Sequence, residues 1–233
     1  DTKNFSKVIY YAERHLLDKS LQSYHSNILR MKGEAYLSLQ EFATAEVFFK
    51  DLMSTYKYAW VYLGYVRSLL KQGRIDEINE LLEKLTKKPE TRFGAHDLLA
   101  QYYIEHEQYE LAYEEIKKAT ALSPRNIERN KKSWDLARLT HDHEGQYVAT
   151  RNIALQAKNS IHDSPELTLN VIRSGIDFAC AITDARADKV LIQTDKFISH
   201  LENDYVDANE FKQQLLVVKA RLFNVREQVA KAT

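Results

Sequence analysis

This chain of 233 residues is 44% hydrophobic and 28% charged, and its 33 Lys and Arg residues balance 33 Asp and Glu residues. Such a composition is typical of a folded protein with a sizeable core, and it excludes an intrinsically disordered chain. Because the net charge is zero, the chain as a whole offers no positive field that would hold nucleic acid or an anionic membrane surface.

Residues that break helices are scarce. The chain has six Gly and three Pro, where average usage would give roughly sixteen and twelve. Pro89, Pro124 and Pro165 lie 35 and 41 residues apart, each at the end of a helical pattern. The scarcity predicts an all-α protein and the spacing predicts repeats. No stretch approaches the roughly 18 apolar residues of a membrane span, and no apolar signal segment follows the N-terminus, so a cytoplasmic location is expected.

Residues 1–25 are predicted to form an N-terminal capping helix. Their apolar residues recur three or four positions apart, which is the spacing of one helical face. These residues are Phe5, Val8, Ile9, Ala12, Leu16 and Leu17.

The first of four predicted repeats covers residues 26–58. Gly33 and Tyr36 stand three apart in its first helix, and Ala45 and Phe49 stand four apart in its second. Small residues in such positions let two antiparallel helices approach closely, and large ones fill the space between repeats. The pattern predicts a pair of packed helices.

The second repeat, residues 59–92, has two possible registers. One is set by a turn at Gly73, with Ile78 and Leu82 four apart after it. The other begins at Trp60 and would make repeats of unequal length, 31 and 36 residues. We prefer the register of Gly73, and the choice decides which way Trp60 points.

The third repeat, residues 93–130, is the most regular, with Ala112 and Ile116 four apart and Pro124 near its close. The fourth, residues 131–165, is degenerate. It keeps scattered members of the pattern, which are Trp134, Ala137, Gly145, Tyr147, Ala154, Ala157 and Pro165.

Residues 166–233 are predicted to be helical without forming clear repeats. The last helix carries a heptad-like stripe of Phe211, Leu215, Val218, Leu222, Val225 and Val229. One interpretation is that the stripe packs on the preceding helices and closes the array of repeats. The other is that it forms the seam of a homodimer.

The period near 34 and the recurring small and large residues resemble the tetratricopeptide repeat (TPR). The resemblance implies a right-handed α-α superhelix, a solenoid of antiparallel helix pairs, with extra C-terminal helices. Short strings at 95–100, 121–126 and 162–166 are similar to the TPR output region of bacterial two-component response regulators. That similarity implies a role in phosphorelay signal transduction through binding of a partner protein. The alternation of strands and helices expected of a receiver domain is not visible, so no phosphorylation site is carried over.

The first helices of such repeats line a concave face, where positions outside the packing signature point into a groove. The predicted partner-binding groove consists of Asn27, Arg30, Glu34, Trp60, Leu63, Arg67, Asp97, Gln101, Lys132 and Asp135. Trp60 is either an anchor for a partner or ordinary packing against the neighbouring repeat.

Other chemistry finds little support in the sequence. His141, His143 and His162 could suggest a metal site, but the first two fall near a turn, where polar residues are expected from solvation alone. A basic cluster beside Trp134 consists of Arg125, Arg129, Lys131 and Lys132. Glu128 and Asp135 interrupt it, so a solvated face between repeats is favoured over a nucleic-acid patch, and a contact with an acidic protein segment is the next candidate. Cys180 has apolar neighbours in sequence, and a buried position is expected for it.

No phosphate-binding loop or nucleophile motif occurs. We therefore expect a non-enzymatic protein with no cofactor, metal or small-molecule substrate, which binds a protein or peptide. The alternative is a structural scaffold or homodimerisation module unconnected with a phosphorelay.

Overall fold

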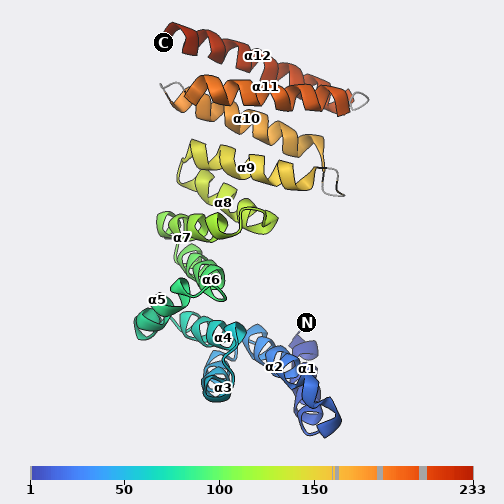
Figure 1. Ribbon diagram of the computed structural model, residues 1–233, viewed down its shortest axis with the longest axis vertical. Coiled ribbons are helices and arrows are strands. Elements are labelled where there is room, and N and C mark those ends of the chain that lie inside the picture. Colours follow the sequence, from blue (N-terminus) through green and yellow to red (C-terminus); the bar gives the residue numbers. More distant parts are fainter. Residues whose placement is uncertain (1, 159, 161–162, 183–185, 205–208, 233) are drawn as a thin grey trace. The chain divides into compact units, whose positions relative to one another are not determined.

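The computed structural model describes residues 2–158, 160, 163–182, 186–204 and 209–232. In these residues the chain is all-helical, with twelve α-helices and two short 3₁₀ helices and without strands (Figure 1). The chain divides into two compact units, Asp1–His106 and Glu107–Thr233. The boundary falls inside the third predicted repeat, so the two helices of that repeat belong to different units.

The first unit consists of helices packed on their neighbours in sequence. Helix α1 packs on α2, α2 on α3, α3 on α4 and α5 on α6, and α4 also contacts both α2 and α6. Their bounds are α1 (Thr2–Leu16), α2 (His25–Ser38), α3 (Phe42–Thr55), α4 (Ala59–Leu70), α5 (Asn79–Lys87) and α6 (Arg92–Glu105), with 3₁₀ helices at Lys19–Tyr24 and Ile75–Ile78.

One aromatic ring fixes the packing of α2, α3 and α4. Phe49 of α3 is 1% exposed and lies against Gly33 of α2 and Gly64 of α4. A Cβ atom would stand 2.5 Å from the Phe49 ring at Gly33 and 2.4 Å from it at Gly64. Any larger residue at either glycine would therefore displace the ring.

In each predicted repeat, the turn that follows the first helix contains a residue with the same backbone conformation. Gln40, Gly73, Glu107 and His141 have φ angles of 62°, 72°, 57° and 56°, and each follows the end of a helix. Residues with left-handed backbone conformation commonly end helices in this way. The four positions are 33, 34 and 34 residues apart, which matches the repeat period and the register of Gly73.

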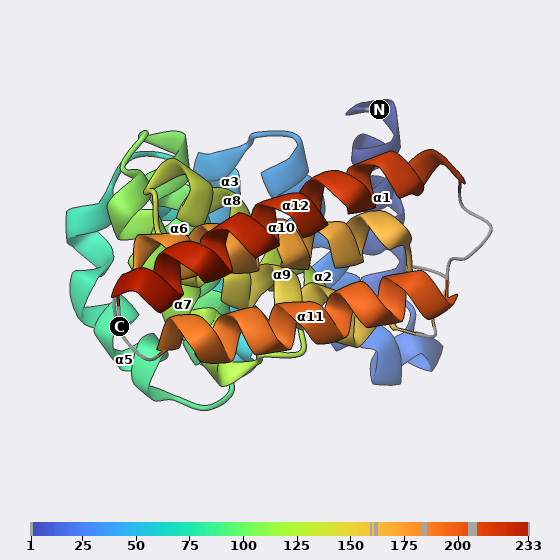
Figure 2. The same cartoon turned by 90° about the horizontal axis from the view of Figure 1, so that it is seen from above.

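The second unit begins with packed neighbours and ends with a three-helix group. Helices α7, α8, α9 and α10 each pack on the next, and α10, α11 and α12 all contact one another and lie side by side in both views (Figures 1 and 2). Their bounds are α7 (Tyr109–Leu122), α8 (Ile127–Leu139), α9 (His143–Ala157), α10 (Pro165–Ala181), α11 (Arg186–Asp204) and α12 (Asn209–Ala232).

Local sequence explains where α10 begins. Ser164 caps the helix, because its Oγ accepts a hydrogen bond from the Leu167 amide at 3.4 Å, and Pro165 occupies the first turn. Proline is tolerated there because its missing N–H has no partner within the helix. Pro165 therefore starts a helix, whereas the preceding helix ends earlier, at Ala157.

Candidate functional site

The predicted groove residues of the first repeat line a real groove. Asn27, Arg30 and Glu34 of α2 border a cavity of about 460 Å³, which we call the α1–α2 groove. Its apolar lining comes from Phe5 and Val8 of α1 and from Met31 and Ala35 of α2. Phe5 and Val8 were predicted from the sequence only as part of the apolar face of the capping helix, and Met31 and Ala35 were not among the predicted groove residues.

Other predicted groove residues of the first unit take part in polar contacts along α2, α4 and α6. Arg67 of α4 donates to Glu34 of α2 at 2.9 Å, and Lys71, which directly follows α4, pairs with Glu105 of α6. Gln101 donates to the same Glu105 carboxylate at 3.0 Å. Glu34 and Arg67 thus link α2 to α4, whereas Gln101 bonds within α6 to the carboxylate that Lys71 contacts.

Trp60 and Leu63 take part in packing. The Trp60 ring stacks on Tyr58 with ring centroids 6.4 Å apart, and it meets Phe49 edge-on at 6.3 Å. Leu63 lies so close to Gly94 of α6 that a Cβ there would stand 2.7 Å from Leu63 Cδ1. Both side chains remain half-buried, so neither projects freely from α4.

The remaining predicted groove residues lie on two units. Asp97 is half-buried on α6 of the first unit, whereas Lys132 and Asp135 are exposed on α8 of the second. In the neighbouring basic cluster, Lys131 pairs with Glu128 at 3.0 Å. The α1–α2 groove therefore gathers three of the ten predicted residues in one pocket.

His141 lies in the turn between α8 and α9, and His143 is the first residue of α9. Within the described residues, no group of three or more His, Cys, Asp or Glu side chains is placed to hold a metal ion, and His162 lies outside those residues. Asp142 instead caps α9, where its carboxylate accepts from the Gly145 amide at 2.9 Å and from the Tyr113 hydroxyl at 2.8 Å.

Cys180 is exposed, so the expectation that it would be buried is wrong. Its neighbour Ala179 is fully buried, and successive residues of a helix point about 100° apart. Partial burial nevertheless raises the pKa of the Cys180 thiol. A raised pKa leaves little thiolate at neutral pH, so the thiol is not activated as a nucleophile.

The stripe of α12 faces the core of the second unit. Val218, Leu222 and Val225 are buried among residues of α10 and α11, and Phe211, Leu215 and Val229 pack partly buried against the same cluster. These six side chains are thus engaged within one chain. The exposed apolar residues of α12 are a different set, Leu216, Val217 and Phe223.

Comparison with protein-family models gives no match, and neither does comparison with curated proteins. In the described part of the chain, the helices are too short or too polar to cross a membrane.

Proposed function

We propose that this chain is a non-enzymatic TPR-type module, a right-handed superhelix of helix pairs, which binds a segment of a partner protein in the α1–α2 groove. The observation that carries the proposal is this groove itself. It combines an apolar lining with polar groups at its border, and three of those border residues were selected from the sequence pattern as partner contacts.

The groove has the chemistry of a peptide site. Met31 is 58% exposed, and its flexible side chain adapts to different apolar partners. Asn27 offers amide donors and an acceptor to a peptide backbone. Glu34 is already paired with Arg67, which leaves the apolar lining as the main source of affinity and Arg30 as a charged contact.

Selection of peptides from a random displayed library against the purified protein tests this function. Enriched peptides should bind wild type in calorimetry, and Met31→Glu should weaken them by about tenfold or more by placing a charge in the apolar lining. Val47→Glu is the matched control, because Val47 is an exposed apolar residue of the same unit outside the groove. Equal affinity of the two variants, or no enrichment, would contradict the proposal.

The similarity to response-regulator output regions extends the proposal to phosphorelay signalling. Partner binding would then respond to phosphorylation of a receiver domain on the same polypeptide. The full-length polypeptide, with and without acetyl phosphate, should bind a selected peptide with different affinities. Unchanged affinity would remove the signalling role and leave the interaction module in place.

Self-association is the second candidate, and the exposed side of α12 favours it. Leu216 and Phe223 are 66% and 63% exposed, and they stand seven residues apart, which places them on one side of the helix. Light scattering over a tenfold concentration range should show a dimer that Leu216→Glu with Phe223→Glu converts to monomer. Ile192→Glu, an exposed apolar position on α11, is the control. A monomer at every concentration would exclude this candidate.

A further inference from the structure

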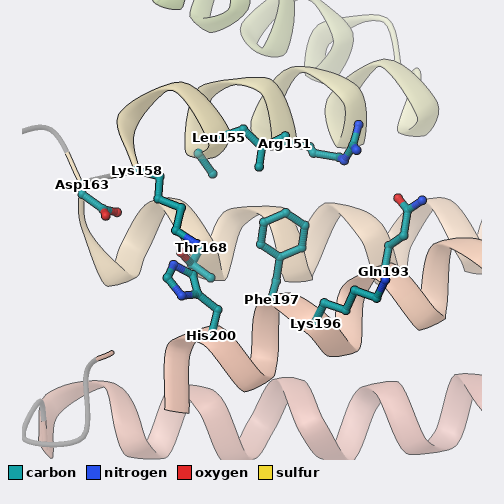
Figure 3. Close-up of a pocket in the computed structure, with 10 residues that line it drawn as sticks. Arg151, Leu155, Lys158, Asp163, Thr168, Gln193, Lys196, Phe197 and His200 are labelled. Atoms are coloured by element: carbon teal, nitrogen blue, oxygen red, sulfur yellow. The ribbon is translucent and has the colours of Figure 1, made fainter. Parts of the chain in front are cut away.

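A second pocket, of about 330 Å³, opens in the second unit between α9 and α11, with α10 beneath it. We call it the cationic pocket. Figure 3 shows the Phe197 side chain standing in its middle, with Lys158 and His200 toward one end and Arg151 and Gln193 toward the other. None of these residues was selected from the sequence, because their grouping depends on how α9 and α11 face each other.

The charge of the cationic pocket is unbalanced. Arg151, Lys158 and Lys196 line it against a single carboxylate, Asp163, and these three cations form no ion pair with any described residue. Elsewhere in the second unit several cations do have carboxylate partners, such as Arg173 with Glu166 at 2.8 Å and Arg186 with Glu144 at 3.2 Å. A concentration of unpaired positive charge in a pocket attracts an anionic ligand.

The cations are spread along the pocket and do not converge on one point. Arg151 lies on α9, and Lys158 directly follows the last residue of that helix, seven residues further on. This spacing separates their backbones by about 10 Å along the helix axis. A lone phosphate or carboxylate is held best by donors that converge on it. In an extended segment of the polyproline II type, side chains three residues apart lie on the same side, about 9 Å from each other.

Between its charged ends the pocket offers apolar and polar contacts. Phe197 and Leu155 lie between Arg151 and Lys158 (Figure 3) and can receive an apolar side chain. The Tyr147 hydroxyl donates to Gln193 Oε1 at 2.9 Å. That bond orients the Gln193 amide so that its Nε2 group is left to donate to a ligand carbonyl.

We propose that the cationic pocket binds an extended acidic peptide segment, in which two carboxylates three residues apart flank an apolar side chain. Arg151 pairs with one carboxylate and Lys158 with the other, Lys196 adds attraction from α11, and the apolar side chain packs on Phe197. This site lies in the second unit and does not rest on the α1–α2 groove, so either proposal can fail without the other.

Fluorescence anisotropy with a labelled peptide of four Glu-Leu-Pro repeats tests the proposal at low ionic strength. The peptide should bind wild type, and the matched Lys-Leu-Pro peptide should not. Arg151→Glu with Lys158→Glu should weaken binding by about tenfold or more, because both charge contacts become repulsive. Lys196→Gln removes one positive charge without adding a negative one, and it should weaken binding by about threefold.

The control variant is Arg125→Glu with Lys212→Glu, which makes the same charge change at two exposed positions of the second unit outside the pocket. It should change the affinity by less than about twofold. Circular dichroism verifies that every variant is folded. An equal loss of affinity in both double variants would show that only the net charge of the protein matters, and this would overturn the proposal. Absence of peptide binding to wild type would overturn it as well. Displacement of the peptide by millimolar inorganic phosphate would show a phosphate site instead.

Discussion

At the residue scale, the close approach of Phe49 to two glycines fixes the packing of the first unit. Gly33 and Gly64 belong to different predicted repeats, yet both contact the same ring. The segment from Trp60 to Gly64 does not set the repeat register, but it contributes to packing. Its glycine leaves the space that the Phe49 ring of the preceding helix occupies.

We expect Gly64→Ala to destabilise the first unit by about 1–3 kcal/mol, because its new methyl group would overlap the buried Phe49 ring. Urea unfolding followed by Trp60 fluorescence, in a Trp134→Phe background, measures the change. Gly73→Asn is the control, because no atom lies within 4 Å of a Cβ at that position and asparagine tolerates positive φ. The control should stay within about 0.5 kcal/mol of wild type, and equal destabilisation in the two variants would contradict the packing argument.

Because of Tyr113, the free energy of unfolding should depend on pH in the alkaline range. Burial, and then the Asp142 carboxylate that its hydroxyl contacts, raise the pKa of Tyr113 above its usual value of 10.0. A raised folded-state pKa stabilises the neutral phenol, so the contribution is complete below about pH 10 and is lost as the pH rises further. Tyr113→Phe cannot ionise, and its free energy of unfolding should fall less steeply between about pH 10 and 11. Parallel curves for the two proteins, followed by Trp134 fluorescence, would refute this.

At the element scale, the sequence predicted the helices and the turn at Gly73 because apolar periodicity and glycine placement are local signals. It could not identify Gln40, Glu107 and His141 as left-handed, since each is an ordinary polar residue whose conformation depends on the helices it joins. The four apolar residues that line the α1–α2 groove were not selected as groove residues for a similar reason. An apolar helix face has the same sequence pattern whether a neighbouring helix covers it completely or in part. The cationic pocket depends on two helices that are distant in sequence.

The stripe of α12 gives a prediction that separates packing from association. Leu222 is 4% exposed and Leu216 is 66% exposed. Leu222→Ala should therefore destabilise the second unit by about 2–5 kcal/mol through loss of buried surface and creation of a cavity. Leu216→Ala, the same substitution at an exposed site, should remain within about 0.5 kcal/mol of wild type. Urea unfolding measured by Trp134 fluorescence would decide, and similar losses at both positions would show that Leu216 is also covered.

At the scale of the whole molecule, each unit has a hydrophobic core of its own. The buried clusters of the first unit include Phe49 and Leu69, and the cluster of the second includes Ile172 and Leu222. Units with separate cores can unfold independently. Each unit also contains one tryptophan, Trp60 in the first and Trp134 in the second.

We therefore expect two urea transitions in the intact protein. Variants that keep a single tryptophan, Trp134→Phe or Trp60→Phe, should report different midpoints, because each signal follows a different core. Leu222→Ala should shift the transition seen by Trp134 and leave the one seen by Trp60 in place. Coincident transitions that shift together would show that the two cores unfold as one cooperative system.

The four left-handed turns have a consequence for the divergence of this chain. Gln, Gly, Glu and His occupy equivalent turn positions, so the repeat persists in the backbone where the side chains have no common identity. Each non-glycine turn costs about 1 kcal/mol of backbone strain, which the packing of the flanking helices must offset. Distant relatives of this protein should therefore share the turn spacing more faithfully than the residues that make the turns.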